Sequence, residues 1–436
     1  MNGAMPCGSS MWPIWLQLSS DMKRDQGVSA YIFVTLAYWA FMLSDGALRM
    51  LVLLHFHTLG YSPVQLAYLF VFYEVAGIVT NLAAGWIAAR FGLNVTLYAG
   101  LSLQIVALLA LAQLDVTWAI GASVLYVMVV QGLSGVAKDL AKMSAKSAVK
   151  LLAPKTGGGL FRWVALLTGS KNAVKGFGFL LGALLLAQFG FTSVVYAMAL
   201  VLAIILALLL FALPTGLSQK KKDAKFKDVF SKNANVNWLS FSRVFLFGAR
   251  DVWFVVAIPI YFYAVLSDGS LGANKSAFFM IGTFMAVWII LYGAVQARAP
   301  KLLKAAQRGE GALVSDAFKW IALLSVLPAA LALWLFLDEN PNQWLTTTLI
   351  VGLLAFGALF ATCSALHSYL ILSFTEKDRV TLDVGFYYMA NASGRLLGTL
   401  LSGVTYQIGG LWLCLATSSA MLVLSAQGAR KLRSDL

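Results

Sequence analysis

The residues of this sequence that are most able to do chemistry are ionisable side chains inside long apolar stretches. A charged group at membrane depth is expensive, and for that reason it marks a functional position by default. Five of these groups are positive and three are negative, so the set has a surplus of two positive charges and favours an anionic ligand. The set is Asp45, Arg49, Glu74, Lys171, Lys175, Arg250, Asp251 and Arg395.

The positive groups are typical of an oxyanion site. A guanidinium binds phosphate-like oxygens through a bidentate fork, so Arg49 and Arg250 are predicted to clamp a tetrahedral oxyanion. Lys171 and Lys175 are one helical turn apart and share a face, which suits a second anionic end of the substrate. The alternative is that the charges pair internally, for example Asp45 with Arg49. The other predicted substrate-binding residues are Asn172, Asn391 and Arg395.

Three carboxylates are candidates for coupling transport to protons. Asp45, Glu74 and Asp251 lie within apolar stretches, where a carboxyl group takes up a proton more readily than in water. The alternative is that they form structural salt bridges. No nucleotide-binding Gly-x-x-x-x-Gly-Lys-Ser/Thr loop is present, so the energy would come from a gradient, an exchange or downhill flow.

A row of lysines recurs every four residues, which places it on one face of a helix. It could attract an anionic substrate towards an entrance, or it could form a basic girdle that faces lipid. The row is Lys138, Lys142, Lys146 and Lys150. No nucleophile or metal-binding motif accompanies it, and His55-x-His57 alone makes no metal site. We therefore expect no enzyme activity, no catalytic residue, no metal and no cofactor.

The amino-acid composition indicates that membrane-spanning helices hold these residues in place. Of the 436 residues, 60% are apolar and 11% are charged, and the mean hydropathy is +0.81. Soluble domains are about 45–50% apolar and about 25% charged, so a soluble enzyme is nearly excluded. A membrane helix needs about 20 apolar residues, and twelve suitable stretches predict an all-α membrane protein with twelve transmembrane helices. They are residues 28–57, 62–89, 94–114, 118–138, 160–188, 192–213, 237–266, 276–297, 315–337, 344–372, 380–407 and 410–429.

The charge of the connections orients these helices. Lys and Arg collect in alternate connections and give the chain a net charge of +14. By the positive-inside rule, both termini are expected in the cytoplasm. The predicted parts are a cytoplasmic leader (1–27), a six-helix bundle (28–213), a basic cytoplasmic linker (214–236), a second six-helix bundle (237–429) and a cytoplasmic tail (430–436).

Internal repeats relate the two bundles. Gly178 and Gly182 recur 216 residues later as Gly394 and Gly398, and Asn172 recurs 219 residues later as Asn391. The Gly85-x-x-x-Ala-Arg90 pattern recurs 208 residues later, from Gly293 to Arg298. Two parallel six-helix halves resemble the major facilitator superfamily fold, which implies a substrate held between the halves.

The loop that follows the second stretch supports that resemblance. Gly85, Arg90 and Gly92 match the gating-loop motif of major facilitators, whereas Ala89 replaces the acidic residue of the motif.

Longer segments resemble a narrower family, the organoarsenical efflux permeases called ArsJ. The resemblance is carried by residues 48–57, 60–63, 72–81, 133–147 and 162–172, including the run Lys138-Asp-Leu-Ala-Lys-Met-Ser-Ala-Lys-Ser147. It implies export of 1-arseno-3-phosphoglycerate across the bacterial cytoplasmic membrane, and thus resistance to arsenate. Glyceraldehyde-3-phosphate dehydrogenase, which makes the ester, would be the functional partner. We expect a monomer in the lipid bilayer, with no nucleic acid partner.

Two other functions stay open. An organophosphate/phosphate antiporter of the same fold would use the same pair of arginines. A multipass membrane enzyme, such as a lipid-modifying transferase, is less favoured because the sequence repeats one set of six helices as a second set of six and has no motif for a nucleophile or a metal.

Overall fold

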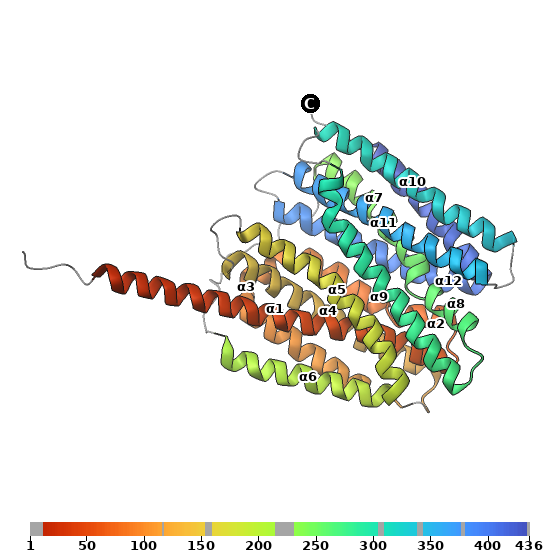
Figure 1. Cartoon of the computed structure of the whole chain (residues 1–436), viewed down its shortest axis with the longest axis horizontal. Coiled ribbons are helices and arrows are strands. Elements are labelled where there is room, and N and C mark those ends of the chain that lie inside the picture. Colours follow the sequence, from red (N-terminus) through yellow and green to blue (C-terminus); the bar gives the residue numbers. More distant parts are fainter. Residues whose placement is uncertain are drawn as a thin grey trace, which may run out of the picture.

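The computed structural model describes residues 12–115, 117–152, 159–213, 231–303, 309–337, 343–375 and 380–433, which form a bundle of helices (Figure 1). Residues 1–11 of the expected leader, 214–230 of the linker and 434–436 of the tail lie outside these ranges. The helices are α1 (Trp12–Thr58), α2 (Pro63–Tyr68), α3 (Val71–Leu111), α4 (Ile120–Leu152), α5 (Gly159–Phe189), α6 (Phe191–Ala212), α7 (Ala234–Phe254), α8 (Ala257–Leu266), α9 (Leu271–Leu302), α10 (Glu310–Leu337), α11 (Gln343–Phe374) and α12 (Val380–Arg430).

The prediction of twelve membrane-spanning helices is confirmed. Eleven segments of the described residues are long and apolar enough to cross a membrane, and the last of them, Leu382–Arg430, has 49 residues. Gly410 divides this segment, because its φ of 66° lies outside the helical region and in the region that favours glycine. Each part is long enough for one crossing.

The first helix begins earlier than the sequence analysis suggests. Residues 12–27, expected to belong to a separate leader, are helical and continue without a break into the span Ile32–Thr58. The early part of α1 projects from the bundle in Figure 1.

One predicted helix is broken near its middle. The stretch 237–266 forms α7 and α8, which meet at Val255 and Val256. Pro259 explains the break, because proline has no N–H to donate and its ring clashes with the carbonyl four residues earlier. The amides of Val256 and Ala257 donate instead to Ser402 Oγ, at 3.3 and 3.2 Å. This satisfies donors that lipid could not satisfy.

The repeated glycines have the same structural role in both halves. A Cβ atom on Gly178 of α5 would lie 2.5 Å from the carbonyl oxygen of Leu43 in α1. A Cβ atom on Gly394 of α12 would lie 2.1 Å from the carbonyl oxygen of Val244 in α7. The backbones of α1 and α5 therefore touch, as do those of α7 and α12, because small residues let membrane helices approach closely.

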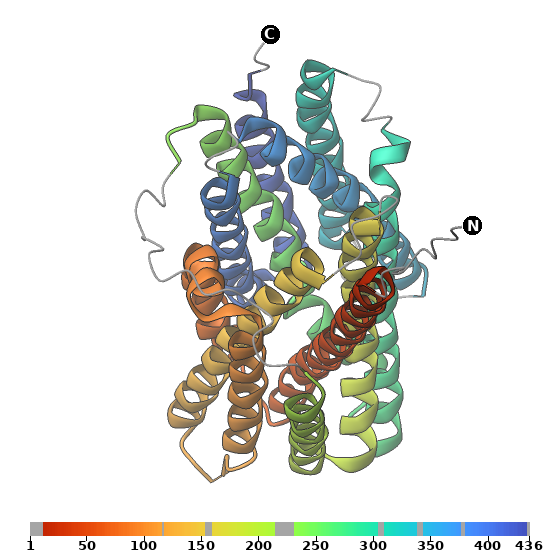
Figure 2. The ribbon, with the colours of Figure 1, turned by 90° about the vertical axis from the view of Figure 1, so that its left-hand side faces the viewer.

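The second glycine of each pair repeats the contact one turn later. Gly182 approaches the carbonyl oxygen of Ala47, and Gly398 approaches that of Gly248, so that added Cβ atoms would lie 2.3 and 2.5 Å away. Ala47 and Gly248 are 201 residues apart, as are Leu43 and Val244. The two halves thus have one internal architecture. In Figure 2 the red-to-yellow helices gather mainly in the lower part and the green-to-blue helices mainly in the upper part.

Helices of the two halves pack against each other at two interfaces. α5 packs against α9, and α12 packs against α2 and α3. At the first interface, a Cβ atom on Gly293 would lie 2.9 Å from Cβ of Asn172. At the second, a Cβ atom on Gly403 would lie 2.6 Å from both the Pro63 carbonyl oxygen and Ala67 Cβ.

These contacts lead to a first testable prediction. Gly182→Ala and Gly394→Ala should each lower the apparent melting temperature and the yield of monodisperse protein, because the new methyl group meets backbone atoms that cannot move aside. Overpacking of this kind costs about 1–3 kcal/mol or more. The control is Gly121→Ala, since nothing lies within 4 Å of a Cβ atom there. Melting temperatures of Gly182→Ala and Gly394→Ala equal to that of Gly121→Ala would contradict the prediction.

Candidate substrate-binding site

Eight charged residues from six helices contact one another or the ring of Tyr73 and form one network, here called the central cluster. It contains seven of the eight ionisable residues singled out from the sequence, together with Lys138. Its members are Asp45, Arg49, Glu74, Lys138, Lys175, Arg250, Asp251 and Arg395.

Glu74 connects the two halves of the protein through this network. It lies on α3, and its side chain is 1% exposed. The Oε1 atom accepts hydrogen bonds from Nη2 of Arg49 at 3.1 Å and from Nη2 of Arg395 at 2.6 Å. Because Arg395 lies on α12, this carboxylate joins α1 and α3 of one half to the other half.

Asp251 extends the network within the second half. Its Oδ1 atom lies 2.5 Å from Nη2 of Arg250, and its Oδ2 atom accepts from Nε of Arg395 at 3.4 Å. Arg395 therefore contacts one carboxylate of each half. Such a bridge ties the two halves together for as long as both contacts persist.

Asp45 pairs with Lys175 and not with Arg49. Its Oδ2 atom lies 2.6 Å from Nζ of Lys175, and its Oδ1 atom accepts from the hydroxyl of Tyr73 at 2.5 Å. The sequence alternative paired Asp45 with Arg49, but Arg49 pairs with Glu74. Tyr73 links the Asp45–Lys175 pair to the Arg49–Glu74 pair. Its hydroxyl donates to Asp45, and the guanidinium of Arg49 lies 5.5 Å from the centre of the Tyr73 ring.

Lys138 does not occupy the open position that an entrance or a lipid-facing girdle requires. It is 9% exposed, and its Nζ atom lies 4.0 Å from the centre of the Tyr73 ring. Lys142, one turn on, donates to Asn81 Oδ1 at 3.0 Å and contacts Asp139 Oδ1 at 3.4 Å. The side chains of Lys146 and Lys150 lie outside the described residues. The turn of α4 that carries Lys138 thus faces inwards.

The structure separates the other predicted substrate-binding residues. Lys171 is half-buried, one turn before Lys175 on α5. Asn172 packs against Gly293 at the contact between α5 and α9. Asn391 lies on α12, where its Oδ1 atom accepts from Nε of Arg243 at 3.0 Å.

The gating-loop residues lie away from the cluster, in the turn within α3. Gly92 has a φ of 77°, which explains why the turn needs glycine. Arg90 is exposed, and its guanidinium lies 5.6 Å from the centre of the Trp86 ring. Gly85 is helical, and its surroundings lie outside what the structure describes.

Arg49 and Arg250 occupy corresponding positions in the two halves. They are 201 residues apart, the same offset as the paired glycine contacts of α1 and α7. Each pairs with a carboxylate, Glu74 or Asp251, and each lies over aromatic rings. The two guanidinium groups are therefore held at symmetric sites within the bundle.

Sequence reasoning missed two residues of this region. Tyr73 carried no charge to draw attention, and Arg243 lies nearer the start of its apolar stretch than Arg250. The spacing of Arg243, Phe247 and Arg250 was a usable signal, because residues at i, i+4 and i+7 share one face of a helix.

The cluster contains five cations and three carboxylates, a surplus of two positive charges. Within the described ranges, no group of three or more His, Cys, Asp or Glu residues could hold a metal ion. The arrangement suits the binding of an anion between two helical halves.

The fold and the position of the cluster are those of a membrane transporter with two related halves. The sequence matches the Major Facilitator Superfamily over residues 34–314, so the chain belongs to this superfamily of secondary transporters.

Two solved structures illustrate the fold. A mutant of the nucleoside transporter NupG has a TM-score of 0.71 and 15% identity, and the match covers 94% of this chain and 100% of that chain. A POT family transporter in complex with 5-aminolevulinic acid has a TM-score of 0.68 and 13% identity, with coverage of 91% and 94%. A search of curated proteins finds no match.

Proposed function

We propose that this transporter exports a small organic anion with more than one phosphate-like group, and that 1-arseno-3-phosphoglycerate is its cargo. The surplus of two positive charges in the central cluster is the observation that carries the proposal. Buried cations without matching carboxylates need an anionic partner, because burying unpaired charge is costly.

The charge of the cargo suits this surplus. A phosphate-like group carries about −1.5 to −2 charges at pH 7, so an ester with two such groups carries about three to four. The guanidinium groups of arginine bind phosphate oxygens in pairs, and the ammonium groups of lysine bind them as single charges. The resemblance of residues 133–147 and 162–172 to organoarsenical permeases selects the arsenic ester among anions of this kind. In this proposal the protein lies in the bacterial cytoplasmic membrane with both termini inside.

A resistance assay tests the cargo. Expression in an arsenate-sensitive bacterium should protect the cells when glyceraldehyde-3-phosphate dehydrogenase is co-expressed, because that enzyme forms the ester. Cells that carry either gene alone are the controls. Protection without the dehydrogenase, or protection against arsenite, would overturn the substrate assignment.

An antiporter that exchanges an organophosphate for phosphate is the second candidate, because the same cationic cluster suits it. Vesicles loaded with inorganic phosphate separate the two. Uptake of a labelled organophosphate that requires phosphate inside the vesicles would favour the antiporter.

A further inference from the structure

The second half of the protein contains a buried cation outside the central cluster. Arg243 on α7 is 4% exposed. Its Nε atom donates to Asn391 Oδ1 at 3.0 Å, and its Nη1 atom donates to the Ser364 hydroxyl at 3.2 Å. Both acceptors are neutral, and no carboxylate of the described residues lies within ion-pair distance of Arg243. The rings of Phe247 and Tyr387, whose centres lie 3.9 and 4.9 Å from the guanidinium carbon, stabilise this cation without neutralising its charge. A buried charge without a counter-ion is costly, so an anionic ligand would be bound favourably here.

The corresponding place in the first half is electrically balanced. The glycine offset of α5 and α12 places Asn391 at the position of Lys175, and not at that of Asn172 as the sequence repeat suggested. The offset of α1 and α7 places Arg243 at the position of Met42. Lys175 contacts the carboxylate of Asp45, whereas Asn391 offers Arg243 an uncharged amide. The two halves share one architecture. Among the described residues, however, the cation of the second half, Arg243, has no carboxylate partner, whereas Lys175 of the first half has one.

Further hydrogen-bonding groups gather beside Arg243. The hydroxyl of Tyr292 and the Nε2 atom of Gln296 each lie 3.3 Å from the Ser364 hydroxyl. His367 follows Ser364 by three residues on α11 and therefore shares its face. His367 is fully buried, and neither of its ring nitrogens has a hydrogen-bond partner among the residues that the structure describes. A neutral imidazole has one N–H to donate, so this side chain has an unused donor.

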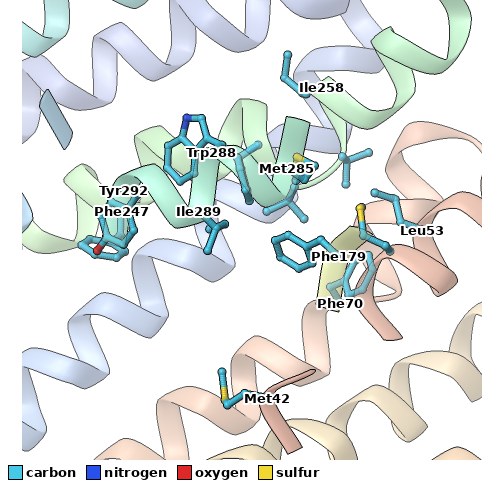
Figure 3. Packing of buried hydrophobic residues seen from close by; sticks show 14 of the residues in the cluster. Met42, Leu53, Phe70, Phe179, Phe247, Ile258, Met285, Trp288, Ile289 and Tyr292 are labelled. Carbon is cyan, nitrogen blue, oxygen red and sulfur yellow. The ribbon is translucent and has the colours of Figure 1, made fainter. Parts of the chain in front are cut away.

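The Arg243 site is close to the central cluster. The guanidinium carbon of Arg243 lies 3.9 Å from the centre of the Phe247 ring, and that of Arg250 lies 5.0 Å from it. The sum of these two distances is the upper limit for the separation of the two guanidinium groups. Phe247 and Tyr292, which overlap in the view of Figure 3, both pack on the ring of Phe360, with ring centres 5.0 and 5.6 Å away.

This upper limit leaves both guanidinium groups within reach of a short ligand with two anionic ends. Six bonds separate the two tetrahedral centres of a three-carbon ester, which places them roughly 7 Å apart at ordinary bond lengths. One molecule can therefore reach both guanidinium groups.

We propose that Arg243, with Ser364 and His367, binds the second anionic group of the substrate, while the central cluster binds the first. The ligand of this second site is a phosphate or carboxylate group of a two-headed organic anion. The inference rests on the proposed function and adds a substrate specificity to it. Anions with one charged group occupy the central cluster alone, and anions with two charged groups occupy both sites.

Binding to the purified full-length protein tests the second site. The probes are 3-phosphoglycerate, which has two anionic groups, and inorganic phosphate, which has one; isothermal titration calorimetry in nanodiscs gives both affinities. We expect the parent protein to bind 3-phosphoglycerate at least about tenfold more tightly than phosphate. Arg243→Gln should weaken 3-phosphoglycerate binding to the level of phosphate and leave phosphate binding unchanged.

Two further variants keep the test decisive. His367→Gln removes the unused imidazole donor with little change of volume, and it should weaken 3-phosphoglycerate binding alone, even if Arg243→Gln fails to fold. Arg430→Gln is the matched control, because Arg430 is exposed at the end of α12, and it should bind like the parent.

The outcomes separate this inference from the proposed function. If Arg243→Gln and His367→Gln bind both probes like the parent, or lose both equally, the second site is wrong and the proposed function stands. If the parent binds neither probe, the proposed function falls and the second site with it.

Discussion

Replacing either Arg49 or Arg250 by lysine is expected to leave a folded, inserted protein that has lost most of its export activity. Lysine keeps the positive charge and therefore the ion pair with Glu74 or Asp251. It loses the planar fork that binds two oxygens of a tetrahedral oxyanion. Losing one partner of a buried charged contact costs about 2–5 kcal/mol, which corresponds to at least about tenfold in ligand affinity.

Transport into everted vesicles measures this loss, with size-exclusion chromatography to verify folding. Arg298→Lys is the control. It makes the same chemical change away from the cluster, because Arg298 is exposed near the end of α9. If Arg49→Lys and Arg250→Lys both transport like the parent, the two arginines are structural ion-pair partners and the oxyanion clamp is wrong.

The double variant Asp45→Asn/Glu74→Gln is expected to lose its response to a pH gradient. Asp45 forms an ion pair with Lys175 and accepts a hydrogen bond from Tyr73. Glu74 forms ion pairs with Arg49 and Arg395. A proton on either carboxyl group would weaken these contacts and free the cations for the substrate. An amide cannot take up that proton, so the coupling should disappear.

Everted vesicles with and without an imposed pH gradient give the measurement. Asp268→Asn is the matched control, because Asp268 is exposed in the connection between α8 and α9. Transport rates of the parent protein that are the same with and without the pH gradient would rule out proton coupling. Normal gradient-driven transport by the double variant would assign the coupling to other groups.

The sequence predicted the fold well because the relevant signals are local. Apolar runs of sufficient length give the spans wherever the helices end up, and Gly178 and Gly394 indicate close backbone contact from spacing alone. The merging of two spans into α12 and the break between α7 and α8 were not predicted, since Gly410 and Pro259 act through backbone geometry that hydropathy does not report.

The site was only partly predictable, because the choice of partners depends on which helices face each other. Spacing suggested that Asp45 pairs with Arg49, whereas packing of α5 on α1 gives it Lys175. Lys138 had the spacing of a surface stripe, yet its turn of α4 faces Tyr73. The spacing of Arg243, Phe247 and Arg250 could have drawn attention to Arg243, but its neutral partners Asn391 and Ser364 become known only from the packing of α7 on α12 and α11.

The surplus charge of the central cluster has an electrical consequence for the transport cycle. A membrane potential of 100 mV acts with about 2.3 kcal/mol on each elementary charge that crosses it. With the proposed cargo, which has about three to four negative charges, the central cluster and Arg243 together carry about zero to one negative charge when loaded and three positive charges when empty. An inside-negative membrane potential would then draw the empty site back inwards and would not oppose the outward movement of the loaded site.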